Sequence, residues 1–154
     1  MRFLLISVGK IRAKEMSSLV GEYEKRAGRY WPLEVVEVRE ESARSRTAAE
    51  VKAKEGERLL EAVGGALVVA CDERGTMLRS EEFAEWLRVE REKAVRDVAF
   101  VIGGAYGLSE GVLARADRRM ALARWTLPHE LARLVLVEQL YRAGTILRGE
   151  PYHK

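Results

Sequence analysis

The chain contains little of several residue types that define common protein classes. Its 154 residues include one cysteine, Cys71, two histidines and no asparagine. A single cysteine excludes an intrachain disulfide and is typical of proteins from a reducing cytoplasm, where we expect this one to act. One cysteine and two histidines also offer too few ligands for a typical zinc site, so we expect no metal. The lack of asparagine, with only one glutamine, fits a thermophilic source.

Several sequence motifs are missing as well. No run of about 18 apolar residues occurs, so we expect no membrane span. The apolar start of the chain is too short for a secretory leader and lacks a small-residue cleavage site. There is no P-loop, and the first strand candidate ends at Val8-Gly9-Lys10 without the glycines of a dinucleotide site. Ser109 lies outside a nucleophile-elbow pattern. A Rossmann oxidoreductase and a serine hydrolase are therefore both disfavoured.

The composition is that of an ordinary globular protein. Hydrophobic residues make up 47% and charged residues 33% of the chain, which suffices for one domain over residues 1–154 with a substantial core. The formal net charge is +3 and the isoelectric point is about 9.1. This mild excess of positive charge is compatible with a nucleic-acid partner but does not by itself argue for one.

Apolar runs alternate with helical patterns along the whole chain. Continuous apolar strands separated by helices predict an α/β fold with a mostly parallel sheet and helices on both faces. We expect Thr47 and Glu50 to form a capping box, Ser80 and Ser109 to cap their helices, and residues 72–75 to form a turn. The predicted strands are 2–8, 33–38, 66–71 and 98–102, and the predicted helices include 12–30, 47–63 and 130–147.

The most informative stretch is the last third of the chain. Residues 100–109, Phe-Val-Ile-Gly-Gly-Ala-Tyr-Gly-Leu-Ser, form a buried strand candidate that leads into a glycine turn. Residues 122–129, Leu-Ala-Arg-Trp-Thr-Leu-Pro-His, suggest a short strand stopped by Pro128 at the start of a long helix. Two strand-end loops so close in sequence can lie side by side at one edge of a sheet. They would then offer backbone groups to a flat, polar ligand.

The last helix is apolar around its whole circumference at Leu134–Val137. It is either a central core helix or a contact between two copies of the chain, and the second interpretation is slightly favoured. Glu138 and Arg142 are one helical turn apart, so they either form a salt bridge or line a pocket. His129 reads more readily as a helix-start residue than as a catalyst, and Cys71 more readily as a packed thiol than as a nucleophile.

Four motifs together carry a family resemblance. Residues 102–109 (IGGAYGLS), 125–133 (WTLPHELAR), 138–143 (EQLYRA) and 151–153 (PYH) occur in this order. With Val8-Gly9-Lys10 and Lys54-Glu55-Gly56, they make the chain resemble the ribosomal RNA large subunit methyltransferase H family from end to end. The resemblance implies a SPOUT-class methyltransferase with a C-terminal trefoil knot that acts as a homodimer. It also implies methyl transfer from S-adenosylmethionine to N3 of pseudouridine 1915 in helix 69 of 23S rRNA, on the assembled ribosome.

The resemblance further implies which residues hold the cofactor. These are Cys71, Gly103, Gly104, Leu122, Ala123, Arg124, Trp125, Thr126 and Leu127. The chain departs from the family at three places. Cys71 stands where leucine is frequent, Ala105-Tyr106-Gly107 replaces a frequent Pro-Glu-Gly, and Lys154 ends the chain where arginine occurs. Lysine keeps the charge of arginine but not its bidentate binding of phosphate.

The candidate catalytic residues are His153, Tyr152, Arg142, Glu138 and His129. N3 of the base must lose a proton, and the sequence does not choose among His153, His129 and Glu138 as its acceptor. Tyr152 can stack on the target base, while Arg142 and Arg133 can hold a phosphate or a base edge. The alternative function is a non-catalytic RNA- or nucleotide-binding α/β module, which would need the same basic residues but no cofactor pocket.

Overall fold

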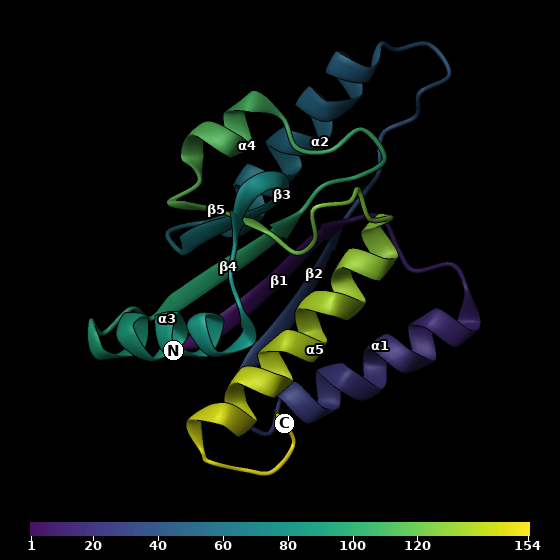
Figure 1. Cartoon of the computed structure of the whole chain (residues 1–154). Helices are drawn as coiled ribbons and strands as arrows, with labels where there is room; N and C mark the ends of the chain where they lie inside the picture. Colours follow the sequence, from purple (N-terminus) through teal and green to yellow (C-terminus); the bar gives the residue numbers. More distant parts are fainter.

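A computed structural model describes residues 1–154 as one five-stranded sheet between two layers of helices (Figure 1). The strand order is β2-β1-β4-β3-β5, and every pair of neighbouring strands is parallel. The elements are β1 (Arg2–Val8), α1 (Lys14–Ala27), β2 (Leu33–Val38), α2 (Ala48–Val63), β3 (Leu67–Met77), α3 (Ser80–Glu92), β4 (Asp97–Ile102), α4 (Glu110–Arg115), β5 (Arg118–Ala121) and α5 (His129–Leu147). The predicted α/β class, with helices on both faces, is confirmed.

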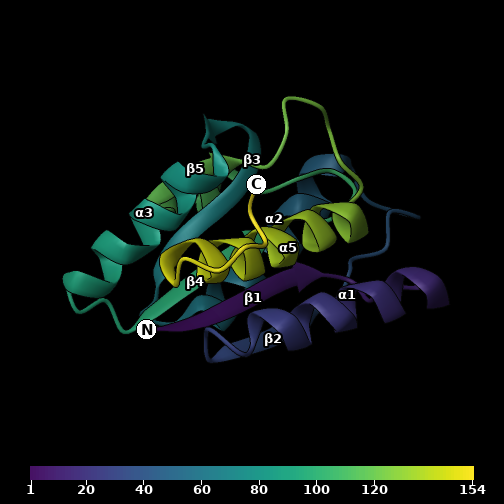
Figure 2. The same cartoon turned by 60° about the horizontal axis from the view of Figure 1, so that its bottom comes forward.

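Alternate residues of the strands supply two separate cores. Phe3, Leu5 and Phe100 face the layer of α1, α3 and α5, whereas Leu4 and Ile6 face the layer of α2 and α4. This division follows from the period of two along a strand. α5 lies between α1 and α3 on its face of the sheet (Figure 2). The apolar sequence of α5 is explained in part by this central position, since Leu136, Val137 and Leu140 are fully buried.

Two local predictions in the middle of the chain are wrong. Residues 72–75 do not form a turn, because β3 continues to Met77 with a shift of its register against β5 between Cys71 and Thr76. Gly75 is needed there since a Cβ would lie 2.6 Å from the backbone nitrogen of Met120. The short strand expected from Leu122 is also misplaced. β5 precedes it at Arg118–Ala121, where two arginines disguise the apolar pattern.

The helix caps were predicted with mixed success. Thr47 and Glu50 form the expected capping box of α2, and the Ser109 hydroxyl accepts a hydrogen bond from the Val112 N–H at 3.3 Å. Ser80 does not cap α3. It is the first residue of the helix, and its hydroxyl donates instead to Gln139 of α5 at 2.8 Å. None of the helices is both long and apolar enough to span a lipid bilayer.

Candidate functional site

A cavity lies at the carboxyl ends of three neighbouring strands, β4, β3 and β5. It has a volume of about 670 Å³, within the range of small-molecule sites. Its walls are residues 71–74 of β3, residues 102–108 at and after the end of β4, Lys52 of α2, and a loop after β5 that leads into α5. The expectation that the two loops of the last third of the chain share one edge is confirmed, because both line this cavity.

The loop after β4 forms a tight glycine turn. The Gly107 N–H donates to the Gly104 carbonyl at 3.0 Å, and Gly107 has a φ of +82°. A Cβ on Gly103 would lie 2.7 Å from the Gly107 carbonyl carbon, so the turn closes only without a side chain there. Both Gly103 and Gly104 line the cavity, and Tyr106 at the tip is 47% exposed.

Gly104 is needed for a reason that the sequence did not suggest. The resemblance assigns Gly104 to the cofactor, and Gly104 lines the cavity. A Cβ at this position would also lie 2.7 Å from the Glu55 Oε2 and 3.1 Å from the Val8 Cγ1. The glycine therefore allows β1 and α2 to pack directly against the turn.

The loop after β5 forms the opposite wall. Leu122, Ala123, Trp125, Thr126 and Leu127 all line the cavity, whereas Arg124 does not. The Thr126 hydroxyl donates to the Glu73 carboxylate, which ties this loop to β3. Trp125 is 82% exposed. A large aromatic side chain at the rim of a cavity leaves an apolar surface free for a second molecule.

Cys71 lines the cavity, at the irregularity in β3. The side chain is only partly buried, but desolvation of its sulfur raises the pKa of the thiol to about 12. A thiol that stays protonated at neutral pH is a poor nucleophile. This supports the interpretation of Cys71 as a packing residue of the cavity wall.

His129 is the only one of the five candidate catalytic residues that lines the cavity. It is the first residue of α5, and its Nε2 is buried without a hydrogen-bond partner. Gly9 lies close to this nitrogen, because a Cβ built on Gly9 would be 3.7 Å from it. The interpretation of His129 as a helix-start residue is confirmed, and the same residue lines the cavity.

Arg133 has a role that differs from the expected one. Its side chain is 8% exposed and pairs with Glu24 of α1 at 2.8 Å and with Glu37 of β2 at 2.6 Å. Burial works against its charge, but the hydrogen bonds to Glu37 and Glu24 outweigh that effect and raise its pKa. An arginine with both carboxylates in place is not free to hold a phosphate. It fixes the first turns of α5 beside the cavity instead.

The other four catalytic candidates form a second cluster, which we call the tail cluster: Glu138, Arg142, Tyr152 and His153. The Glu138 Oε1 accepts hydrogen bonds from Arg142 at 2.6 Å and from the Tyr152 hydroxyl at 3.0 Å. His153 lies between Arg142, at 3.3 Å, and Glu81 of α3, at 3.1 Å. The C-terminal residues are therefore anchored and do not form a frayed end.

Contacts within the tail cluster change the pKa of Tyr152. The ring centroid of Tyr152 is 4.5 Å from that of Tyr141, and the Arg142 guanidinium lies over the Tyr152 ring at 4.7 Å. Burial, together with hydrogen bonding to Tyr23 and Glu138, raises the pKa of Tyr152 well above its usual value. Its hydroxyl therefore stays protonated and acts as a hydrogen-bond donor at neutral pH.

The cavity and the tail cluster do not meet within one chain. None of the four residues of the tail cluster lines the cavity. At about 1.5 Å per residue along α5, Glu138 is about 14 Å and Arg142 about 20 Å from His129. The sequence predicted one site, and the structure divides its residues between two places.

One residue of the site region was not identified as functional from the sequence. Glu55 of α2 is 4% exposed and lies directly behind Gly104. A signal for it existed, because Glu55 occupies the same helix face as the buried Val51 and Leu59, four residues away on either side. An acidic residue in an apolar stripe requires a specific reason.

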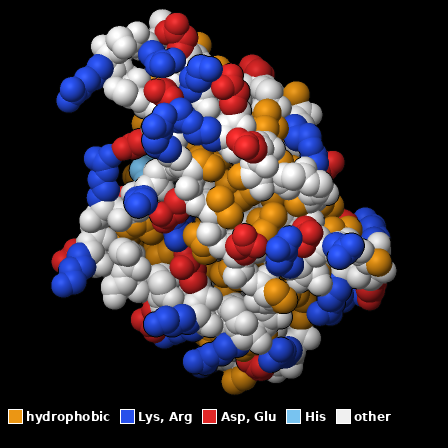
Figure 3. Space-filling view, turned by 180° about the vertical axis from the view of Figure 1, so that it is seen from behind, with side chains coloured by type: hydrophobic (Ala, Val, Ile, Leu, Met, Phe, Trp, Pro, Cys, Tyr) orange, Lys and Arg blue, Asp and Glu red, His pale blue; other side chains and the backbone are white.

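One face of the molecule shows no single-sign patch of charge. Seen from behind, acidic and basic side chains are mixed around a patch of apolar surface (Figure 3). No group of three or more His, Cys, Asp or Glu side chains is placed to hold a metal ion.

Comparison with known proteins agrees with this geometry. A family model described as "Predicted SPOUT methyltransferase" matches residues 1–153. Proteins named "Ribosomal RNA large subunit methyltransferase H" from Gemmatimonas aurantiaca and Anaeromyxobacter dehalogenans are 54% and 53% identical to this chain over the full length of both partners. A solved probable methyltransferase from Bordetella pertussis has a TM-score of 0.57 at 18% identity, covering 92% of this chain and 95% of that one. That likeness shows a shared fold.

Proposed function

Because this chain belongs to the SPOUT methyltransferase family, we propose that it transfers a methyl group from S-adenosylmethionine to 23S rRNA in the cytoplasm. The target that the family resemblance implies is N3 of pseudouridine 1915 in helix 69. The observation that carries this proposal is the cavity at the ends of β3, β4 and β5. Its two loops are the ones that the resemblance assigns to the cofactor. A single SPOUT-type domain over residues 1–154 and a C-terminal trefoil knot are part of the same proposal.

The residues of the cavity fit such a cofactor. Half of the 20 lining residues are hydrophobic, which suits the adenine ring, and the glycine turn brings peptide groups to the surface of the wall. S-adenosylmethionine would supply a methyl group on a positively charged sulfur. The chain then has to hold the rRNA base in line with that methyl group, exclude water, and accept the proton that N3 releases.

The proton acceptor is either the cavity residue His129 or one of two residues of the tail cluster, His153 and Glu138. His129 lines the cavity, and its buried Nε2 has no hydrogen-bond partner within the chain. His153 and Glu138 belong to the tail cluster, where each already has hydrogen-bond partners. Tyr152, whose hydroxyl stays protonated, suits the positioning of a base through stacking and donation rather than proton uptake. Arg142 lies beside it and has the charge to hold a phosphate.

A homodimer would bring these two groups together. Leu131 and Val135 of α5 are only partly buried and belong to neither core. They form an apolar strip between the cavity and the tail cluster. If two α5 helices paired antiparallel across this strip around a two-fold axis, the tail cluster of one subunit would lie toward the cavity of the other. The separation of about 14–20 Å within one chain supports this arrangement.

The experiment is methyl transfer to assembled ribosomes and to free rRNA by the full chain and by a chain that lacks residues 151–154. We expect the truncated chain to bind S-adenosylmethionine normally, because no residue of the cavity is removed. Its methyl transfer should fall at least about tenfold, equivalent to about 1.4 kcal/mol of transition-state stabilisation. A full chain that binds no S-adenosylmethionine would instead favour a non-catalytic RNA-binding module.

A further inference from the structure

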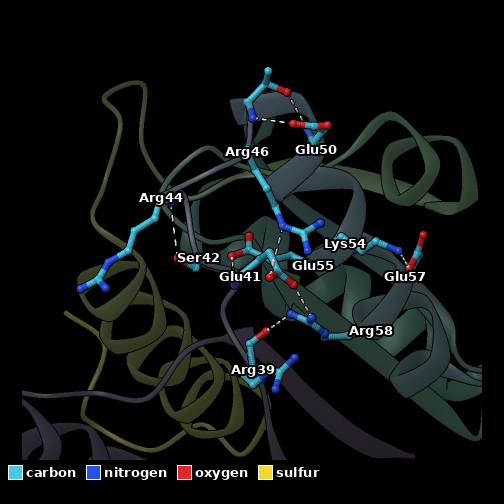
Figure 4. Close-up of polar contacts among 11 residues, drawn as sticks. Arg39, Glu41, Ser42, Arg44, Arg46, Glu50, Lys54, Glu55, Glu57 and Arg58 are labelled. Atoms are coloured by element: carbon cyan, nitrogen blue, oxygen red, sulfur yellow. Dashed lines mark hydrogen bonds and ion pairs between the residues drawn. The ribbon is translucent and has the colours of Figure 1, made fainter.

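Glu55 is a buried carboxylate with an unsatisfied oxygen beside the candidate site. It is 4% exposed and lies between α2 and the segment that joins β2 to α2 (Figure 4). Its Oε1 accepts a hydrogen bond from the Glu41 N–H at 3.0 Å. Its Oε2 is buried and has no partner. A buried carboxylate oxygen without a partner is costly, so its retention calls for a functional reason.

The free oxygen faces the glycine turn. A Cβ on Gly104 would lie 2.7 Å from the Oε2 of Glu55 and 3.1 Å from its Oε1. Gly104 lines the cavity, whereas Glu55 does not. The carboxyl group is thus packed behind the turn, with the backbone of Gly104 between it and the cavity. The absence of a side chain at position 104 lets the carboxyl group approach the cavity this closely.

The arginines near Glu55 form their hydrogen bonds and ion pairs with other residues. Arg58 bonds to the Glu41 carboxylate and donates to the Arg39 carbonyl at 2.8 Å, and Arg46 pairs with Glu41 at 3.6 Å (Figure 4). Burial raises the pKa of Glu55, and the charges of Glu40 and Glu41 act in the same direction. The Glu41 N–H and the charge of Arg58 act in the opposite direction and favour the carboxylate. No cation makes a direct ion pair with Glu55.

We propose that Glu55 is a positioning residue whose negative charge, acting across the Gly104 turn, favours a positively charged ligand in the cavity over its neutral counterpart. This inference rests on the proposed function and deepens it. In methyl transfer the bond between sulfur and the methyl carbon breaks and its electron pair stays on sulfur. The sulfonium cofactor becomes a neutral thioether, and the methyl carbon bonds to N3 of the base as the N3 proton leaves. A negative charge behind the turn therefore raises the affinity of the cavity for S-adenosylmethionine relative to S-adenosylhomocysteine, which assists release of the product.

The test compares the affinities of the two ligands. Calorimetric titration of the full-length protein with each ligand gives a ratio of dissociation constants. Glu55→Gln keeps the size of the side chain and an acceptor for the Glu41 N–H but removes the charge. We expect it to weaken S-adenosylmethionine about tenfold and S-adenosylhomocysteine less than about twofold, the scale of a charge pair at an effective dielectric near 20. The matched control is Glu57→Gln, which neutralises a mostly exposed carboxylate of the same helix and should leave both affinities unchanged.

A second variant tests the opposite sign and leaves the Glu55 side chain itself unchanged. Arg58 is 25% exposed, and its charge partly offsets that of Glu55. Arg58→Gln should therefore raise the preference for S-adenosylmethionine about two- to threefold. This variant also serves if Glu55→Gln fails to fold.

The outcomes separate this inference from the proposed function. An equal loss of both affinities in Glu55→Gln would mean that Glu55 only supports the glycine turn. Unchanged affinities would mean that Glu55 neither supports the turn nor favours the charged ligand. Either result overturns the inference while the proposed function stands. An unchanged or lowered preference in Arg58→Gln overturns it as well. If the unaltered chain binds neither ligand, the proposed function itself fails.

Discussion

The ion pairs of Arg133 allow a quantitative prediction for the framework of the site. Arg133 joins α5 to Glu24 of α1 and to Glu37 of β2. Arg133→Met keeps most of the apolar stem of the side chain but removes the charge. Two carboxylates are then left near each other without a cation. Removing one partner of a buried pair is destabilising because the remaining charge has lost its compensation.

The magnitude follows from the exposure of the partners. A fully buried pair broken in this way costs about 3–5 kcal/mol. Glu24 and Glu37 are 22% and 29% exposed, so water recovers part of that loss. We expect the free energy of unfolding to fall by about 2–3 kcal/mol, measured by urea denaturation at pH 7. Arg88→Met is the control, because Arg88 makes two carboxylate contacts on an exposed helix face, and its loss should hardly move the midpoint.

A triple variant separates charge from packing. Adding Glu24→Gln and Glu37→Gln to Arg133→Met removes the stranded charges, so most of the lost stability should return. A single variant as stable as the unaltered chain would refute this reasoning, and so would a triple variant no more stable than the single one. In the second case the loss would come from the packing of the arginine stem.

Three further predictions concern the dimer, the glycine turn and the thiol. Val135→Glu should give monomers or aggregates in analytical ultracentrifugation, because a buried unpaired charge costs several kcal/mol, and a normal active dimer would contradict the proposed α5 contact. Gly104→Val should abolish S-adenosylmethionine binding and also lower the melting temperature, since its Cβ would meet Glu55 and Val8; unchanged affinity would remove Gly104 from the site. Cys71 should react slowly with iodoacetamide at pH 7, and, because its folded pKa near 12 exceeds the ordinary value of 9.0, the stability it contributes should decline above about pH 9. Rapid labelling at pH 7 would contradict that assignment.

The sequence was sufficient for the class of fold and for the two loops that line the cavity. Continuous apolar strands separated by helices are stable only as a parallel sheet with both faces covered, so β1 and β4 were evident from their residues alone. The capping box of Thr47 and Glu50 is equally local, because its two hydrogen bonds join residues three positions apart. The glycine turn after β4 and Pro128 before α5 marked the two loops that line the cavity.

Local patterns failed where a distant part of the chain decides the conformation. Residues 72–75 have a turn-like composition, but pairing with β5 keeps them in β3, and Gly75 is required by the backbone of Met120. Arg133 has the charge that a phosphate contact requires, but its guanidinium forms ion pairs with Glu24 of α1 and Glu37 of β2. The pairing partners of a strand or a charge are set by the packing of the whole chain, and sequence spacing does not contain that information.

The division of the site is the clearest case of tertiary control. The sequence identified the candidate residues of the C-terminal motifs and their order along the chain. The sequence could not place His129 at the cavity and Glu138, Arg142, Tyr152 and His153 together elsewhere, because that depends on how α5 lies across the sheet and how the last residues fold back onto it. The sequence alone did not indicate what Glu55 packs against, for the same reason. Its meaning comes from Gly104, 49 positions away in the chain, whose missing side chain lets the two groups touch.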